Sequence, residues 1–244
     1  MESPLKVKHV LLIGASGGIA EACLAQLESS PDITQITAVS RQPEPAHLTK
    51  TDWISLPQQN EQSIAQCCAT FPAQHYDLVI STIGVLHDEA NSITPEKKLE
   101  DIGENALSEY FRINSILPAL WLKGLVTKIN PEHSNIVFFS ARVGSISDNG
   151  LGGWYGYRAS KSALNMLLKT AQIEYQRRAK GCNFIAYHPG TVDTRLSEPF
   201  QRNVKPEKLF TPEFTVERLF AILSSPPDSP PPWYLDWQNK PIPW

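Results

Sequence analysis

Short, almost continuously apolar runs alternate along the chain with segments of helical periodicity. The apolar runs lie at residues 8–14, 33–41, 52–56, 76–84, 134–141, 182–190 and 233–237. Between them, apolar residues recur at the spacing of one helix face, up to residue 27 and at residues 60–71, 105–128, 153–179 and 215–223. Strands that are apolar along their whole length are typical of a parallel sheet buried on both faces. The pattern therefore predicts an α/β fold, a doubly wound parallel sheet with helices on both faces.

Composition narrows the class of protein without identifying it. No shift in composition resembles a linker, so we expect one domain, residues 1–244. A net charge of -3 gives no reason to expect nucleic acid or an acidic membrane as a partner. No uncharged apolar run approaches the roughly 18 residues that span a bilayer, and the first residues do not form a secretory signal. The 4 cysteines have no metal-like spacing. We therefore expect a cytoplasmic protein with reduced thiols and no bound metal.

Glycines mark the junction between the first apolar run and the helix that follows it. In "LLIGASGGIAEA" these are Gly14, Gly17 and Gly18. Glycine allows a sharp turn and a close approach of the backbone to a pyrophosphate, while the helix N-terminus offers free N–H groups to the phosphates. A tight turn without a ligand is the alternative. The position in the first strand–helix unit favours a nucleotide.

The end of the second apolar run bears on the choice of dinucleotide. An acidic residue there would bind the ribose 2′-hydroxyl, whereas an arginine accommodates a 2′-phosphate. The sequence "AVSRQPE" has Ser40 and Arg41, and its first acidic residue is Glu44. This favours NADP(H) over NAD(H), with a solvated loop arginine as the alternative.

A tyrosine and a lysine share one face of the helix predicted from "GWYGYRASKSALNML". Tyr157 and Lys161 lie four residues apart, which is one helical turn. A surface pair is the simplest interpretation. However, a phenol with a pKa near 10 exchanges protons poorly at neutral pH, and a cation within about 4–6 Å lowers that pKa by about 1–3 units. We therefore expect Lys161 to lower the pKa of Tyr157, so that the phenol acts as a general acid and base.

Five motifs together resemble the short-chain dehydrogenase/reductase family in order and approximate spacing: "GASGGIA", "FRINS", "FFSARVGS", "YRASK" and "HPGTVDT". The resemblance covers nearly the whole chain. The segments "GVLH" and "PEKKLEDI" and the final "IPW" are similar to the branch with the C-factor proteins and sniffer-type carbonyl reductases. The resemblance implies a single-domain Rossmann-type fold, hydride transfer between a nicotinamide and a small carbonyl or alcohol substrate, and a homodimer or homotetramer.

The resemblance also implies roles for individual residues. Tyr157 matches the catalytic acid/base, Lys161 the lysine that tunes it and binds the nicotinamide ribose, and Asn114 the asparagine that holds a relay water. An exposed mid-helix asparagine is the alternative for Asn114. The expected cofactor-binding residues, from turn chemistry and from the motif match, also include Gly14, Ser16, Gly17, Gly18, Ile19, Ser40, Arg41, Gly84, Pro189, Gly190, Val192 and Thr194. By turn chemistry alone, Pro189 and Gly190 are equally typical of a strand end.

The chain departs from the family pattern at the end of the fifth apolar run. The family's catalytic serine falls on Ala141, and Ser140 aligns with the residue before it. Side chains alternate along a strand, so Ser140 requires a local change to replace that serine and is kept as a candidate. Losing one hydrogen bond to a developing oxyanion costs about 2.7–4 kcal/mol, which slows a reaction without abolishing it. The first hypothesis is therefore the hydride-transferring oxidoreductase that the resemblance implies. The departure at Ala141 favours a second hypothesis, a C-factor-like nucleotide-binding signalling or regulatory protein with weak or no catalysis.

The segment at residues 195–213 stands where the family has its substrate lid. Leu196, Phe200 and Leu209 are candidates for an apolar wall beside Trp154, with ordinary packing under a loop as the alternative. Arg142 is a candidate for attracting a carboxylate or phosphate, and an ordinary solvated arginine is the alternative. The sequence names no substrate.

Overall fold

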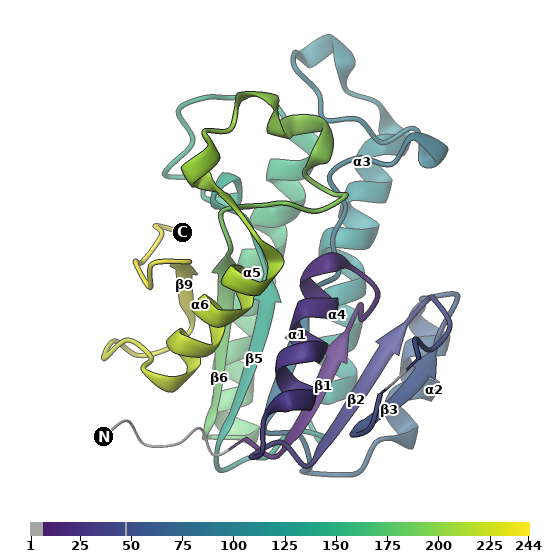
Figure 1. Ribbon diagram of the computed structural model, residues 1–244. Coiled ribbons are helices and arrows are strands. Elements are labelled where there is room, and N and C mark those ends of the chain that lie inside the picture. Colours follow the sequence, from purple (N-terminus) through teal and green to yellow (C-terminus); the bar gives the residue numbers. More distant parts are fainter. Residues whose placement is uncertain (1–6, 47) are drawn as a thin grey trace.

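A parallel sheet forms the centre of the molecule. The computed structural model describes residues 7–46 and 48–244, and within them the main sheet has 7 strands in the order β3-β2-β1-β4-β5-β6-β9 (Figure 1). The strands are β1 (His9–Ile13), β2 (Gln35–Ser40), β3 (Thr51–Ser55), β4 (Leu78–Ser81), β5 (Ser134–Phe139), β6 (Cys182–His188) and β9 (Trp233–Asp236). Every neighbouring pair is parallel. The strand order reverses between β1 and β4, the place where such sheets bind ligands at their carboxyl ends.

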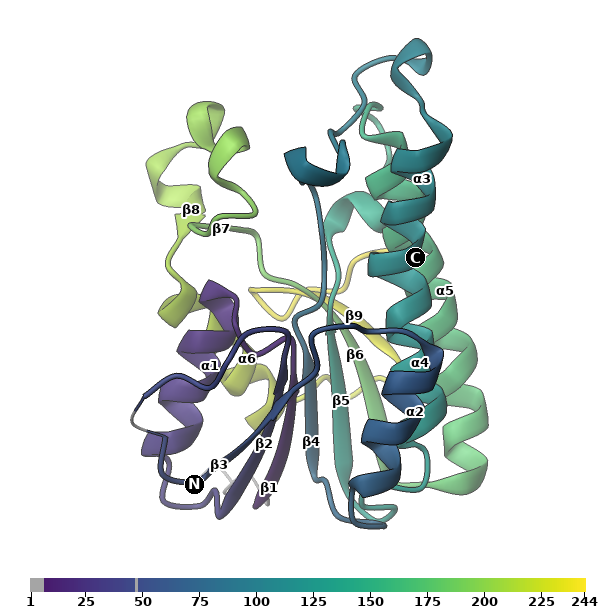
Figure 2. The same ribbon diagram turned by 90° about the vertical axis from the view of Figure 1, so that its right-hand side faces the viewer.

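Helices cover both faces of this sheet. Figure 2 shows α1 and α6 on one face and α2, α4 and α5 on the other. The helices are α1 (Gly18–Ser29), α2 (Glu61–Thr70), α3 (Glu104–Phe111), α4 (Leu117–Leu125), α5 (Tyr155–Arg178) and α6 (Pro212–Ser224). Neighbouring residues of β1 divide between two buried clusters, since Leu11 and Ile13 pack on one face while Val10 and Leu12 pack on the other. The predicted doubly wound fold is therefore confirmed. None of the described helices is both long and apolar enough to cross a membrane.

The helix predicted at residues 105–128 is interrupted by a wider turn. A π turn at Arg112–Ile116 lies between α3 and α4, and the Leu117 N–H donates to the Arg112 carbonyl, five residues back. Asn114 and Ser115 lie within this turn and are buried. The apolar periodicity of the segment did not predict it.

Two segments extend beyond the carboxyl ends of the strands (Figure 2). One contains the 3₁₀ turns η1 (Glu89–Asn91) and η2 (Leu99–Asp101) and leads into α3. The other, residues 193–208, is called the lid segment below and contains η5 (Glu198–Asn203) and η6 (Pro206–Lys208). Its two ends are joined by a small parallel pair, β7 (Thr191–Val192) with β8 (Leu209–Phe210). The remaining 3₁₀ turn, η4 (Arg142–Gly144), follows β5.

Candidate active site

The turn between β1 and α1 leaves an open helix N-terminus. Gly14 has a φ of 88°, and a Cβ there would lie 2.8 Å from the Thr82 Oγ1. Gly17 caps α1 without any side-chain hydrogen bond to the first turn, and beyond its two chain neighbours no described residue lies within 4 Å of a Cβ built on it. Open space and N–H groups without intrahelical partners are what a phosphate requires. The turn therefore fits the pyrophosphate of a dinucleotide.

The loop after β6 meets this turn. The Cβ position of Gly18 lies 3.4 Å from the Thr194 Cγ2. Gly190 has a φ of 80°, and a Cβ there would lie 2.6 Å from the Phe210 ring, so a larger residue would separate the loop from β8. Thus the structure brings Thr194 of this loop beside Gly18 of the turn, while Gly190 packs against Phe210.

Ser40 and Arg41 differ in exposure at the end of β2. Ser40 is buried, and its hydroxyl accepts the Gln42 N–H at 3.0 Å. Arg41 is exposed. Hydrogen bonding from Asn91 is the main reason that the pKa of Asp88 is lowered, and the charge of Arg41 contributes a smaller part. The Arg41 guanidinium therefore stands at the surface, near the segment that follows β4.

Tyr157 and Lys161 are almost completely buried on the first turns of α5. They are 7% and 3% exposed, and the Lys161 Nζ lies 5.9 Å from the centre of the Tyr157 ring. The same Nζ donates a hydrogen bond to the Phe139 carbonyl at 2.8 Å. The structure therefore excludes the simple surface pair.

The expected lowering of the Tyr157 pKa is wrong for the polypeptide by itself. Burial raises the pKa of Tyr157, and burial also lowers the pKa of Lys161 to about 8. Water stabilises a phenolate and an ammonium more than a neutral phenol and amine, so removing it disfavours both charges. The prediction counted the attraction between the two groups and omitted this loss of solvation.

Asn114 joins the segment after β4 to α5. Its Oδ1 accepts the Val85 N–H at 2.8 Å, and its Nδ2 donates to the Val85 carbonyl and the Ser160 hydroxyl, each at 3.0 Å. A Cβ on Gly84 would lie 3.3 Å from the Lys161 Nζ and 3.6 Å from the Asn114 Oδ1. The structure therefore brings Asn114, Gly84 and Lys161 together, and Asn114 is not an exposed helix residue.

A buried carboxylate positions the first turn of α5. Glu96 accepts the Gly156 N–H at 3.1 Å, and its carbonyl accepts the N–H of Trp154, which precedes the helix. A negative charge at a helix N-terminus is stabilised by the helix dipole. Glu96 therefore fixes the turn that carries Tyr157. Sequence reasoning missed it, because a glutamate 60 residues away gives no local capping signal.

Ser140 is not brought to Tyr157. Its hydroxyl donates to the Asn165 Oδ1 at 2.7 Å, on the side of the sheet that α5 covers. The side chain of Ala141 packs against the buried cluster that contains Tyr157. The alternation of side chains along the strand explains this, and Ser140 does not take the place of the missing serine.

Arg142, the other candidate beside β5, is already paired. Its guanidinium lies 2.9 Å from an Asp236 carboxylate oxygen and 3.3 Å from one of Asp148. Its charge is therefore balanced within the chain, which leaves the proposed attraction of a ligand anion without support.

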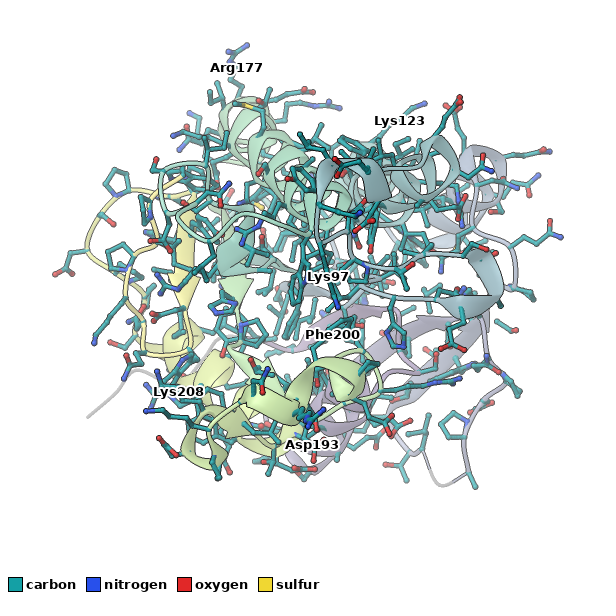
Figure 3. The ribbon with its side chains drawn as sticks, turned by 90° about the horizontal axis from the view of Figure 1, so that it is seen from above. Lys97, Lys123, Arg177, Asp193, Phe200 and Lys208 are labelled. Atoms are coloured by element: carbon teal, nitrogen blue, oxygen red, sulfur yellow. The ribbon has the colours of Figure 1, made fainter. Side chains whose placement is uncertain are left out.

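Aromatic rings from separate segments meet above Tyr157. The Trp154 ring centre lies 6.1 Å from that of Tyr157 and 5.2 Å from that of Phe200, and Phe200 lies 5.8 Å from His87. We call His87, Trp154, Tyr157 and Phe200 the ring cluster. Figure 3 shows Phe200 on η5 near the middle of the molecule. Leu196, by contrast, is 38% exposed. Of the three expected wall residues, Phe200 is the one that joins Trp154.

The open turn and the buried tyrosine–lysine pair define a dinucleotide-binding α/β protein with a titratable site at the strand ends. A family model described as short chain dehydrogenase matches residues 8–205. The chain therefore belongs to the short-chain dehydrogenase family, oxidoreductases that act on alcohol and carbonyl groups with a nicotinamide cofactor. This confirms the resemblance drawn from the motifs.

Curated relatives agree with this membership. Benzil reductase ((S)-benzoin forming) of Bacillus subtilis is 23% identical over 87% of this chain and 92% of its own length. The C-signal protein of Myxococcus xanthus is 24% identical over 60% of this chain and 83% of its own length.

Solved structures share the fold along the whole chain. The carbonyl reductase Sniffer of D. melanogaster superposes with a TM-score of 0.82 at 16% identity, covering 98% of this chain and 100% of that one. The NADPH-bound carbonyl reductase from chicken fatty liver has a TM-score of 0.83 at 22% identity, with the same coverage of 98% and 100%.

Proposed function

We propose that this chain is an NADP(H)-dependent carbonyl reductase or alcohol dehydrogenase that acts on a small carbonyl or alcohol substrate. One observation carries the proposal: Tyr157 and Lys161 are buried on one face of α5, and the Lys161 amine and the Asn114 side chain both lie beside Gly84. A protein that only held a nucleotide would have no need to bury a phenol and an amine together at a cost in solvation.

Tyr157, Lys161 and Asn114 have separate roles in the proposed reaction. NADPH, when bound, supplies the hydride that adds to the carbonyl carbon. Tyr157 donates its hydroxyl proton to the carbonyl oxygen, so the product is an alcohol, and takes a proton back in the reverse direction. An ammonium has three N–H donors, so the Lys161 bond to Phe139 leaves donors for the nicotinamide ribose. We assign Asn114 to the proton relay through water, while its bonds to Val85 and Ser160 hold the segment after β4 against α5.

The preference for NADP(H) rests on the end of β2. Arg41 is exposed there and available to a 2′-phosphate. The Ser40 hydroxyl holds the backbone of the loop that carries it. A structural neighbour is an NADPH-bound carbonyl reductase, which agrees with this assignment. The similarity to benzil reductase favours a bulky aromatic carbonyl compound as the substrate.

We expect the protein to act as a homodimer or homotetramer through α4 and α5. Large apolar side chains are exposed along this part of the molecule at Ile116, Met166 and Ile173. A second copy would remove them from water, and burial of apolar surface drives most protein association.

A second function is favoured by Ala141. Because this residue cannot donate a hydrogen bond to a substrate oxygen, the chain also suits a nucleotide-binding regulatory protein with weak or no catalysis, as the similarity to C-signal suggests. The two functions differ in whether the Tyr157 hydroxyl is needed.

Substitution of that hydroxyl is the decisive experiment. NADPH oxidation is followed against a panel of aldehydes, diketones and quinones for the wild type, Tyr157→Phe and the matched control Tyr155→Phe. We expect Tyr157→Phe to lower kcat by about 10²–10⁴-fold, the usual contribution of a general acid. Tyr155→Phe should stay within about twofold of the wild type, and NADPH binding should change little in either variant. Equal turnover by the wild type and Tyr157→Phe would favour the regulatory function.

A further inference from the structure

Three consecutive residues at the start of α5 have a left-handed backbone. Gly152, Gly153 and Trp154 have φ values of 65°, 67° and 54°, and Trp154 is the residue from which α5 begins. Glycine adopts this conformation freely, whereas a Cβ makes it unfavourable, most of all in a bulky residue. The chain therefore places a tryptophan where the backbone favours glycine.

Polar groups on two sides hold this left-handed turn. The Trp154 N–H donates to the Glu96 carbonyl. The Arg158 guanidinium donates to the carbonyls of Gly153 and Gly152, at 2.8 and 3.0 Å. An unfavourable backbone conformation persists where its surroundings fix it, and such residues cluster at functional sites. These bonds fix the direction in which the Trp154 side chain leaves the backbone.

The Trp154 side chain reaches the surroundings of both Tyr157 and Ala141. Trp154 and Ala141 pack against the same buried cluster, the one that contains Tyr157. The Trp154 ring stands edge to face with the Tyr157 ring, at an interplanar angle of 76°. Trp154 thus lies beside the reacting phenol, in the cluster where the serine hydroxyl is missing.

The indole N–H of Trp154 is a free donor. Those of Trp53, Trp121 and Trp233 each donate to an oxygen of the chain. That of Trp154 donates to no atom in the part of the chain that the structure describes, and Trp154 is partly exposed. A tryptophan N–H away from bulk water usually has a partner. This one is left for a bound molecule.

Other polar groups near the end of β5 are already used or out of reach. The Ser140 hydroxyl, the Arg142 guanidinium and the Ser145 hydroxyl all bond to other groups of the chain. The His87 Nδ1 has no partner within the described residues, but it is buried, so a ligand does not reach it. Of these groups and the Trp154 indole, the indole is the one that is both free and accessible.

We propose that Trp154 is a catalytic residue whose indole N–H donates a hydrogen bond to the reacting carbonyl oxygen of the substrate, in place of the serine that Ala141 replaces. This inference rests on the proposed carbonyl reductase function and deepens it. Negative charge grows on that oxygen as hydride adds to the carbon. A donor aimed at the oxygen therefore stabilises the transition state more than the substrate.

The strained backbone and the missing serine are then explained together. Alanine at position 141 removes a donor from the end of β5, and Trp154 supplies one from the start of α5. Trp154 and Tyr157 lie three residues apart, so their side chains leave the same face of the helix. The two donors can therefore converge on one oxygen, while Phe200 of the lid segment covers the Trp154 ring.

Trp154→Phe tests the indole N–H, because phenylalanine keeps an aromatic ring and the same backbone strain but has no donor. The substitution is made in the wild type and in Ala141→Ser, which returns the serine. Each protein is assayed with NADPH and the panel compound that the wild type reduces fastest. The matched control is Trp233→Phe, which removes an indole N–H on the sheet face that α1 and α6 cover.

We expect Trp154→Phe to lower kcat/KM about 100-fold in the wild type, the effect of losing one oxyanion donor. In Ala141→Ser the same substitution should lower kcat/KM less than about tenfold, because the serine hydroxyl holds the oxygen and the two effects are not additive. Trp233→Phe should stay within about twofold of the wild type. The Kd for NADPH should change less than about twofold in Trp154→Phe.

Other outcomes overturn the inference. An unchanged kcat/KM in Trp154→Phe would show that the indole N–H does not bind the reacting oxygen. An equal loss in the wild type and in Ala141→Ser would show that Trp154 acts through packing, which a returned hydroxyl does not repair.

The same measurements separate this inference from the proposed function. Turnover that needs the Tyr157 hydroxyl but survives Trp154→Phe overturns the inference and leaves the proposed function intact. If the wild type reduces no compound of the panel, the proposed function and the inference both fail.

Discussion

One side of the site is formed by backbone groups and the other by large side chains. On one side, which we call the turn side, the contacts come from backbone: a left-handed Gly14, an uncapped helix start at Gly17, and the loop end at Gly190. On the other side, the ring cluster is made of large side chains from the segment after β4, the start of α5 and the lid segment.

The two sides of the site therefore need different things from the sequence in order to form. On the turn side, Gly14 and Gly17 lie within one strand–helix unit and are set by the local sequence, whereas Gly190 belongs to the loop after β6. The ring cluster needs packing between residues distant in the chain, and it is stable only when the whole sheet is assembled. We therefore expect substitutions on the turn side to affect dinucleotide binding, and those in the ring cluster to affect proton transfer and substrate binding.

The largest effect is expected at Gly17. In Gly17→Ala the new Cβ enters open space, with no described residue beyond its chain neighbours within 4 Å, so the fold should lose only about 0.5 kcal/mol, the cost of alanine at a helix N-cap. A phosphate requires that space, so the Kd for NADPH should rise about 100-fold. Titration by cofactor fluorescence measures this, with thermal unfolding as the readout of stability.

Gly14→Ala is the matched variant of the same turn. Its φ of 88° and the 2.8 Å contact with the Thr82 Oγ1 strain an alanine, so the free energy of unfolding should fall by about 1–2 kcal/mol. If Gly17→Ala instead lost as much stability as Gly14→Ala and bound NADPH normally, the contrast between the two sides would be wrong.

The next effect concerns the burial of Lys161. Its pKa is lowered from 10.5 to about 8 by burial, so between these values the unfolded chain binds more protons than the folded one. The free energy of unfolding therefore rises with pH through this window. Relative to Lys161→Met, the wild type should gain about 2 kcal/mol from pH 8 to pH 10. Urea denaturation at several pH values measures the difference, and a flat difference would show that the amine is solvated.

The smallest effect is expected at Arg41, the charged side chain that we propose binds the 2′-phosphate. Arg41→Ala should raise the Kd for NADPH about tenfold, the contribution of a charge-assisted hydrogen bond to phosphate, and leave that for NADH within about twofold. Arg177→Ala is the matched control, because Arg177 is an exposed arginine at the edge of the molecule (Figure 3). If Arg41→Ala weakened the binding of NADPH and NADH equally, Arg41 would not be the residue that contacts the 2′-phosphate.

The sequence predicted the strands and helices of the sheet and the turn at Gly14 and Gly17, because these are local patterns. The apolar run at residues 8–14 became β1, and the glycines after it form the expected open turn. The ring cluster was only partly predicted. Phe200 and Trp154 were named as candidates, but His87 and Glu96 were not, since their roles depend on partners far away in the chain.

The predicted direction of the Tyr157 pKa shift was also wrong. Spacing along a helix shows that Tyr157 and Lys161 share a face, but it says nothing about how much water remains around them. Burial controls the pKa values of both groups, and burial depends on the packing of every neighbouring segment. The side on which Ser140 lies could, by contrast, be predicted from strand alternation.

The π turn at Arg112–Ile116 has a consequence for engineering. A π turn holds one more residue than a regular α-helix between the same ends. Deleting one residue there would restore regular hydrogen bonding and leave α3 and α4 in place, because the π turn absorbs its extra residue locally. The wide turn that presents Asn114 would be lost. Laboratory evolution that scored heat tolerance alone would reward such a shortened helix, so every round has to score turnover as well.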